Sequence, residues 1–151
     1  MTKDDKCLYL EDLQVGQRFE SGPHALDAEQ IKRFAADFDP QPFHTDEEAA
    51  KGSFFGSLAA SGWHTAAITM RLLTESVPLA GGLIGAKTEM TWPRPTWPGS
   101  TLHVESEIES ITPSRSKPDR GIVVMFSKTL DQDGEVLQTL RVTMIAFKRI
   151  P

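Results

Sequence analysis

The sequence predicts an α+β fold in which one curved antiparallel sheet wraps around a long central helix. The first observation is a helical stretch in the middle of the chain, residues 62–75, that is apolar or small on nearly every side. Such a helix is expected to be surrounded by protein. The second is that the chain after Gly81 is rich in β-branched and aromatic residues, with a strong hairpin signal at Asp133–Gly134. A single sheet wrapped on one helix accommodates both observations.

Size and composition limit the function classes. The chain has 151 residues, so we expect one domain over residues 1–151, with an N-terminal arm at 1–15. The 16 Lys and Arg against 21 Asp and Glu give a net charge of −5, and no basic stripe suggests a nucleic-acid partner. No apolar run approaches the ~18 residues needed to span a bilayer. The single cysteine, Cys7, and the absence of a secretory signal lead us to expect a cytoplasmic protein without a membrane partner.

The first elements are a short strand and a helix. Gly16 marks a turn, and residues 17–20 after it fit a strand. Asp27 fits as a helix N-cap, because Gln30 stands three residues further on, as a capping box requires. The apolar residues that follow fall at helical spacing and give the helix one apolar face: Ile31, Phe34, Ala35 and Phe38.

Residues 39–46, DPQPFHTD, interrupt this helical region. Asp39 and Gln41 both precede a proline, which disfavours helical backbone, so we expect a stiff and irregular connector. The connector carries an acid and an imidazole, Asp39 and His44. These residues alone leave two readings open. One is a plain turn between helices, and the other is a preorganised acid–base pair.

Two helices are expected after the connector. Thr45 is predicted to cap a short helix that ends at Gly52. Ser61 is predicted to cap the central helix, which runs from about Gly62 to Glu75.

Four strands are expected in the rest of the chain, with a polar loop between the second and third. A sheet wrapped on one helix leaves its edges open, and edge-to-edge pairing of two copies would satisfy them. We therefore expect a homodimer or a larger homo-oligomer. The predicted strand segments are residues 83–95, 100–111, 121–131 and 135–150, and the loop is 112–121.

The connector also matches a known motif, an aspartate, any residue, Asn-Pro, any residue and histidine, which usually follows a helix containing Phe-Ala. Gln41 stands where asparagine is common, and the other matching residues are Phe34, Ala35, Asp39, Pro42 and His44. Ser61-Gly62 stands where a His-Gly or similar pair opens the central helix. Over residues 16–147 the chain resembles the MaoC-like dehydratases, relatives of the (R)-specific enoyl-CoA hydratases with the hot-dog fold.

The resemblance implies a hydratase or dehydratase that adds or removes water across the α,β bond of enoyl or 3-hydroxyacyl thioesters. CoA is the expected carrier, and neither a metal nor a cofactor is expected. Asp39 and His44 would hold and activate the water, in either assignment of base and acid. The Gly62 N–H would be the oxyanion donor, because the first turn of a helix has unpaired N–H groups and glycine allows close approach. The expected substrate-binding neighbours are Gln41, Ser61 and Trp63.

Several roles stay open at this stage. An acyl-CoA thioesterase of the hot-dog fold and a non-catalytic acyl-thioester binding module are the alternative functions. Gln41 is expected to hydrogen-bond either the loop backbone or Asp39, or to have a plain surface role. Ser61 is expected to act chiefly as an N-cap, and His64 as a buried histidine with its hydrogen bonds satisfied.

The tryptophans and surface cations also have more than one reading. The tryptophans are expected in the core or a dimer interface, with a wall of the acyl tunnel as the alternative; they are Trp63, Trp92 and Trp97. Arg94 is expected to fasten a dimer, meet a phosphate of the acyl carrier, or form a surface salt bridge. A basic loop is expected either to be solvated or to touch CoA phosphates; its residues are Arg115, Lys117 and Arg120.

Overall fold

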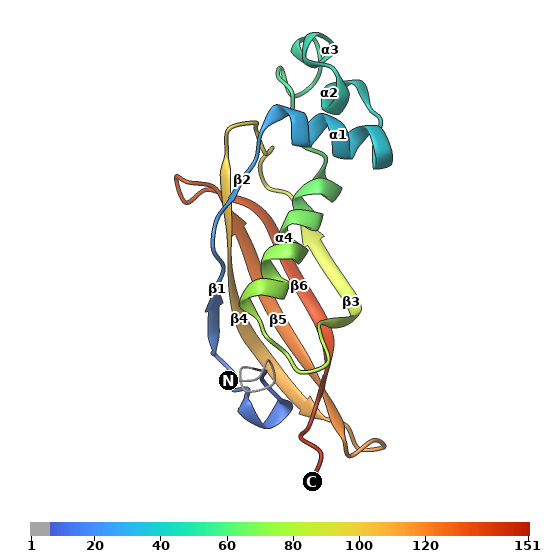
Figure 1. The fold of residues 1–151 in the computed structure, drawn as a ribbon, viewed down its shortest axis with the longest axis vertical. Coiled ribbons are helices and arrows are strands. Elements are labelled where there is room, and N and C mark those ends of the chain that lie inside the picture. Colours follow the sequence, from blue (N-terminus) through green and yellow to red (C-terminus); the bar gives the residue numbers. More distant parts are fainter. Residues whose placement is uncertain (1–6) are drawn as a thin grey trace.

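Figure 1 shows the computed structural model of the protein, which describes residues 7–151. One antiparallel sheet carries the long strands, and the longest helix lies along one face of it. Three shorter helices gather beyond one end of the sheet. The α-helices are α1 (Ala28–Phe38), α2 (Pro42–Thr45), α3 (Glu47–Lys51) and α4 (Gly62–Ser76), and the arm contains the 3-10 helix η2 (Leu10–Asp12). The strands are β1 (Arg18–Glu20), β2 (His24–Ala25), β3 (Ile84–Thr91), β4 (Thr101–Pro113), β5 (Arg120–Leu130) and β6 (Val136–Phe147).

The sheet has the strand order β1-β4-β5-β6-β3, and β2 also pairs with β4. Each of these pairings is antiparallel. The hairpin between β5 and β6 turns at the predicted site, where Gly134 has a φ of 78° that favours glycine. The sequence predicted the four long strands, but β3 ends at Thr91 because Pro93 and Pro95 cannot donate ladder hydrogen bonds.

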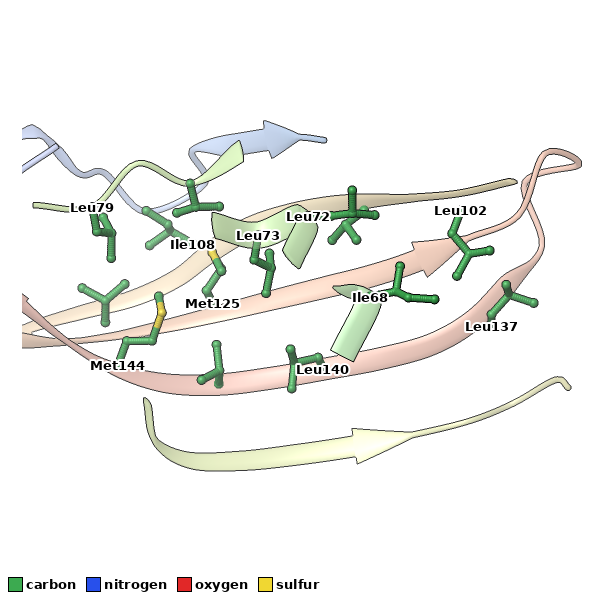
Figure 2. Packing of buried hydrophobic residues seen from close by; sticks show 14 of the residues in the cluster. Ile68, Leu72, Leu73, Leu79, Leu102, Ile108, Met125, Leu137, Leu140 and Met144 are labelled. Carbon is green, nitrogen blue, oxygen red and sulfur yellow. The ribbon is translucent and has the colours of Figure 1, made fainter. Parts of the chain in front are cut away.

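The core lies between α4 and the sheet. Figure 2 shows Leu72 and Leu73 of α4 among side chains from the strands, including Met125 and Leu140. Val104 on β4 is 0% exposed, and alternate residues of β4 and β5 are buried along most of each strand. This alternation is what a sheet with one face on the core requires. The prediction of an antiparallel sheet packed on a central helix is confirmed.

One face of α4 is open to solvent, which the sequence did not predict. Trp63 is 62% exposed and Met70 is 42% exposed, while Ile68 and Leu72 on the opposite face are buried. Arg71 lies on the open face, paired with Glu75. The expectation that protein surrounds this helix is wrong within one chain, because the sheet covers only one side.

The connector after α1 is irregular at Asp39 and Gln41, as predicted, and is followed by one helical turn that the sequence did not predict. Pro42 is the first residue of α2, where its missing N–H costs no hydrogen bond. Thr45 belongs to this turn, and its hydroxyl donates to the Gln41 carbonyl at 3.2 Å. The cap of α3 is therefore Asp46, which accepts hydrogen bonds from the Glu48 and Ala49 N–H groups, and the Thr45 prediction is wrong.

The other predicted helix ends are confirmed. Asp27 caps α1 by accepting from the Gln30 N–H, and Ser61 caps α4 by accepting from the Trp63 N–H. Of the predicted arm, residues 1–6 lie outside the described part of the chain. The rest of the arm packs on the core through Leu10 and Leu13, which are 4% and 6% exposed. Within residues 7–151, no helix has the length and apolar character needed to cross a membrane.

We expect Leu72→Ala to lower the free energy of unfolding by about 2–5 kcal/mol, because it leaves a cavity between α4 and the sheet. Thr74→Ala, on the exposed face of the same helix, should change the free energy of unfolding by less than about 0.5 kcal/mol. Urea denaturation of both variants measures the difference. Equal losses would show that the two faces of α4 are not energetically distinct.

Candidate active site

The largest concavity near the predicted motif opens where the N-terminal end of α4 meets α2 and the segment after β3. It has a volume of about 710 Å³. In Figure 1 the start of α4 lies between the small helices and the sheet. The predicted residues Asp39, Gln41, His44, Gly62 and Trp63 all line it. Ser61 is fully buried behind the wall and contacts Asp39.

His44 is held in one orientation. Its ring is 5% exposed, and its Nδ1 lies 2.6 Å from the carbonyl oxygen of Ala59. A carbonyl oxygen can only accept, so Nδ1 carries a hydrogen and donates it. In neutral His44 this leaves a bare lone pair on Nε2, which faces Asp39 Oδ2 at 3.4 Å.

Asp39 is held by two side-chain donors. The Ser61 hydroxyl donates to Oδ2 at 2.7 Å, and the Gln41 amide donates to Oδ1 at 2.6 Å. Burial by itself raises the pKa of the Asp39 carboxyl, but the hydrogen bonds from Ser61 and Gln41 and the nearby His44 outweigh it and lower this pKa below its ordinary value. Asp39 is therefore a carboxylate at neutral pH, and Gln41 bonds the aspartate rather than the loop backbone.

Asp39 Oδ2 and His44 Nε2 are thus both hydrogen-bond acceptors when the imidazole is neutral. At 3.4 Å they are too far apart for a good direct hydrogen bond. Two acceptors at this spacing suit a small molecule with two hydrogens to donate, such as water. The pair is brought together by the end of α1 and by α2, so its geometry depends on the bend between them.

Gly62 is the first residue of α4, and it lines the cavity. Across residues 7–151, no acceptor is bonded to the Gly62 N–H. The Ser61 carbonyl before it accepts from the His64 and Thr65 N–H groups at 2.9 and 3.1 Å, which fixes the peptide plane that carries this N–H. The start of the helix therefore has a fixed donor with positive dipole character on a residue that lines the cavity.

Aromatic rings form much of the cavity wall. Trp63 and Trp92 both line it and meet edge to face with centroids 5.6 Å apart. The tryptophans were expected in the core or a dimer interface, and the core is excluded because Trp63, Trp92 and Trp97 are 62%, 43% and 38% exposed in one chain. The dimer interface stays a prediction. Trp97 is not among the lining residues.

The sequence did not single out the phenylalanines of the wall. Phe43 and Phe55 lie beside the His44 ring, and Phe54 is 96% exposed at the cavity. The run Phe54-Phe55 between two glycines was the available signal, because exposed aromatic residues in a loop suggest contact with a ligand.

The cations differ in their relation to the cavity. Arg94 lines it and pairs with Glu135 at 3.0 Å, which is the surface salt bridge among the three roles expected for Arg94. The basic loop between β4 and β5 lies at the opposite end of the sheet in Figure 1, so within one chain it does not contact this cavity. Arg120 of that loop pairs with Asp119 and stacks on Phe147. Within residues 7–151, no group of three or more His, Cys, Asp or Glu side chains is arranged to hold a metal ion.

His64 is buried, but its hydrogen bonds are not satisfied as expected. Its ring stacks on Phe34 with centroids 4.5 Å apart, and within the described part of the chain its buried Nδ1 has no hydrogen-bond partner. Burial, with smaller effects from the charges of His24 and Arg33, lowers the pKa of His64 to about 4. His64 is therefore neutral near pH 7, and it is not among the residues that line the cavity.

The family model described as "MaoC like domain" matches residues 12–125. The chain belongs to the MaoC-like dehydratase family. This match includes the α1–α2 connector and the first residues of α4, where the cavity is formed. The resemblance read from the motif is confirmed.

Similar proteins support the same placement. A crystal structure of the MaoC-like dehydratase from Rhodospirillum rubrum is 60% identical, with a TM-score of 0.93 over 95% of this chain and 99% of that one. An uncharacterized protein, YdeM of Bacillus subtilis, is 34% identical over 82% of this chain and 87% of its own length. The R-hydratase PhaJ1 of Pseudomonas aeruginosa is 22% identical, with a TM-score of 0.76 over 95% and 88% of the two chains. The MaoC-like protein described here thus has the hot-dog fold, as the sequence predicted.

We expect the stability of this protein to fall as the pH is lowered from 6.5 to about 4, because of His64. In this window the unfolded chain binds a proton at residue 64 that the folded chain does not, so the group favours unfolding by up to about 3 kcal/mol. His64→Leu should flatten that part of the curve in urea denaturation. Asp39, whose folded pKa is lowered, stabilises the fold above its ordinary pKa of 3.8, and this contribution is lost only as the pH falls below that value. An unchanged slope between pH 6.5 and 4 in His64→Leu would contradict this assignment.

Proposed function

We propose that this protein is a hydratase/dehydratase of enoyl and 3-hydroxyacyl thioesters. The observation that supports this most directly is the pair of acceptors, Asp39 Oδ2 and His44 Nε2, 3.4 Å apart in a cavity that Gly62 also lines. The pair suits a water molecule, and the N–H suits the oxygen of a thioester. Hydration of a conjugated thioester requires the bound water and the N–H donor to act on the same substrate molecule.

In the proposed reaction, the water oxygen attacks the β carbon while one of its protons passes to the base. The electron pair of the α,β double bond moves toward the thioester carbonyl, and the developing oxyanion accepts a hydrogen bond from the Gly62 N–H. The protonated base then gives its proton to the α carbon, which completes the addition of one water. Dehydration is the same path in reverse. The proposal requires no cofactor.

His44 is the better candidate for the base. The Asp39 carboxylate already accepts hydrogen bonds from Ser61 and Gln41, which makes it harder to protonate. Within residues 7–151, no group donates a hydrogen bond to His44 Nε2, and the bond to the Ala59 carbonyl keeps the ring proton on Nδ1. Asp39 would then orient the water and stabilise the imidazolium that forms. Gln41 and Ser61 would act by holding Asp39.

A thioesterase could use the same Gly62 donor. It would send the water to the carbonyl carbon and release the thiol, whereas the hydratase sends it to the β carbon.

CoA is the proposed carrier, and the exposed rings of Phe54, Trp63 and Trp92 would contact the acyl-thioester chain. Arg94 is the cation on the cavity wall that is available to a phosphate, once it leaves Glu135.

Asp39→Asn and His44→Gln should each lower turnover of short trans-2-enoyl-CoA thioesters by about 10²–10⁴-fold, because each removes one of the two groups that hold the water. The measurement is the loss of the conjugated-enoyl absorbance. Asp37→Asn is the matched control, since it changes an exposed carboxylate on α1, two residues before Asp39, that does not line the cavity.

Enoyl absorbance, thiol release and melting temperature together distinguish the three functions. Full activity in Asp39→Asn would overturn the proposed role of the pair. Release of free thiol from the wild type would favour the thioesterase. A ligand-induced rise in melting temperature without any turnover would favour the binding module.

The proposed assembly is a homodimer. Strand β3 is at the edge of the sheet, and only Met90 of its eight residues is even partly buried. The neighbouring open face of α4 carries the apolar residues Ala67 and Met70. A second copy related by a two-fold axis would pair β3 with β3 and cover both α4 faces at once.

Ala67→Glu should weaken this dimer, because it puts a charge into the face that the second copy would cover. We expect sedimentation velocity to show a dimer for the wild type and a larger monomer fraction for Ala67→Glu. Ala49→Glu makes the same change at an exposed position on α3 and should leave the dimer intact. A monomeric wild type at micromolar concentration would rule the assembly out.

A further inference from the structure

A series of hydrogen bonds, buried where it leaves the sheet, connects β6 to the start of α4. Its centre is Gln138 on β6, which is 0% exposed. The Gln138 Nε2 donates to Thr69 Oγ1 of α4 at 3.0 Å, and Gln138 Oε1 accepts from the indole N–H of Trp92 at 3.0 Å. A fully buried amide is costly unless both of its ends are bonded, and here both ends are.

Each hydrogen bond in this series has only one possible donor. The Thr69 hydroxyl has a single hydrogen, which it donates to the Thr65 carbonyl at 2.8 Å. It therefore accepts from Gln138 and from the Thr129 hydroxyl, which lies 2.6 Å away on β5. An indole can only donate, so the Trp92 contact fixes which end of the Gln138 amide is the oxygen.

Trp92 carries this series to Gly62. Its indole N–H also donates to the Gly62 carbonyl at 3.1 Å. The ring lies so close to Gly62 that a Cβ atom there would be 2.8 Å from Cε2 and 3.0 Å from Cζ2 of the indole. A larger residue at position 62 would therefore clash with the Trp92 ring, and it would also obstruct the proposed approach of the substrate.

We infer that Trp92, oriented by Gln138, is a positioning residue that helps to hold the Gly62 N–H in place, because it fixes the Gly62 Cα and carbonyl next to the peptide plane that carries this N–H. The inference rests on the proposed function in one respect, that this N–H receives the thioester oxygen. The Gly62 residue is then held on both sides, since the Ser61 carbonyl before it is bonded within α4 and its own carbonyl is bonded by Trp92. A donor aimed in advance needs no reorientation as the oxyanion forms.

This role predicts a particular kinetic effect. Loosening the Gly62 N–H weakens an interaction that is stronger in the transition state than in the bound substrate, so kcat falls more than KM rises. The pH profile of kcat stays as in the wild type, because Asp39 and His44 keep their partners. A merely structural role for Trp92 would instead lower stability without this separation of kcat from KM.

Two variants separate the hydrogen bonds from the packing. Trp92→Phe keeps an aromatic ring and removes the N–H donor. The double variant Trp92→Phe with Gln138→Met replaces both buried partners by apolar groups, which avoids an unsatisfied amide oxygen and favours a folded protein. Trp97→Phe is the matched control, because Trp97 neither lines the cavity nor makes a side-chain hydrogen bond within residues 7–151.

The first measurement is by NMR on ¹⁵N-labelled protein and requires no turnover. In the wild type we expect the Trp92 indole proton to exchange slowly with solvent. The Gly62 amide resonance should shift in Trp92→Phe and in the double variant, and stay in place in Trp97→Phe. An unshifted Gly62 resonance in both Trp92 variants would overturn the inference, whatever the enzyme does.

The second measurement is steady-state hydration of a short trans-2-enoyl-CoA. Both Trp92 variants should lose about 10- to 100-fold in kcat, part of the loss for a whole oxyanion donor, with KM changed by less than about threefold. Wild-type kcat in these variants, or a loss confined to KM, would overturn the positioning role. A wild type that hydrates no thioester while the NMR shifts appear would overturn the proposed function and leave the Trp92–Gly62 coupling standing.

Discussion

The packing of one face of α4 against the sheet sets the geometry of everything else in this molecule. Leu72 and Leu73 seat the helix on strands that are buried by the same contact, as Figure 2 shows. Because a helix is rigid along its axis, seating its middle also fixes where its first residue lies. That residue, Gly62, is in the wall of the cavity. The hydrophobic core thus places the backbone donor of Gly62 at a defined point, although the core residues themselves lie further along α4.

The second constraint is the link between α1 and α4. Asp39 ends α1, and its carboxylate accepts a hydrogen bond from Ser61, which is also the cap of α4. Ser61 therefore serves two purposes, because its hydroxyl hydrogen goes to Asp39 and its oxygen accepts from the Trp63 N–H. His44 is brought to the same carboxylate by the turn of α2, which Pro42 starts. The acid, the imidazole and the helix start are thus connected through one carboxylate.

Polar side chains between α4 and the sheet extend this organisation. Gln138 occupies a strand position that alternation would give to a side chain facing the helix, and its amide meets Thr69 there. A polar group in such a place must be fully bonded, and the indole of Trp92 completes it. The same indole forms part of the cavity wall. Core packing and the cavity therefore share a side chain.

The sequence by itself determined the kinds of element and the motif residues. Period-2 alternation, the caps at Asp27 and Ser61 and the hairpin at Asp133–Gly134 are local signals, and local signals are legible in one chain. The pairing of Asp39 with His44 was also predictable, because the connector between them is short.

Only the tertiary structure decided the contacts between distant segments. It showed that Trp92 lies on Gly62, that Gln138 bonds that indole, and that one face of α4 is open. These contacts join residues from separate strands and helices, so no spacing along the chain encodes them. The cap of α3 was missed although it is a local feature. Thr45 and Asp46 are adjacent and equally suited to cap a helix, and only the structure shows that Thr45 belongs to α2.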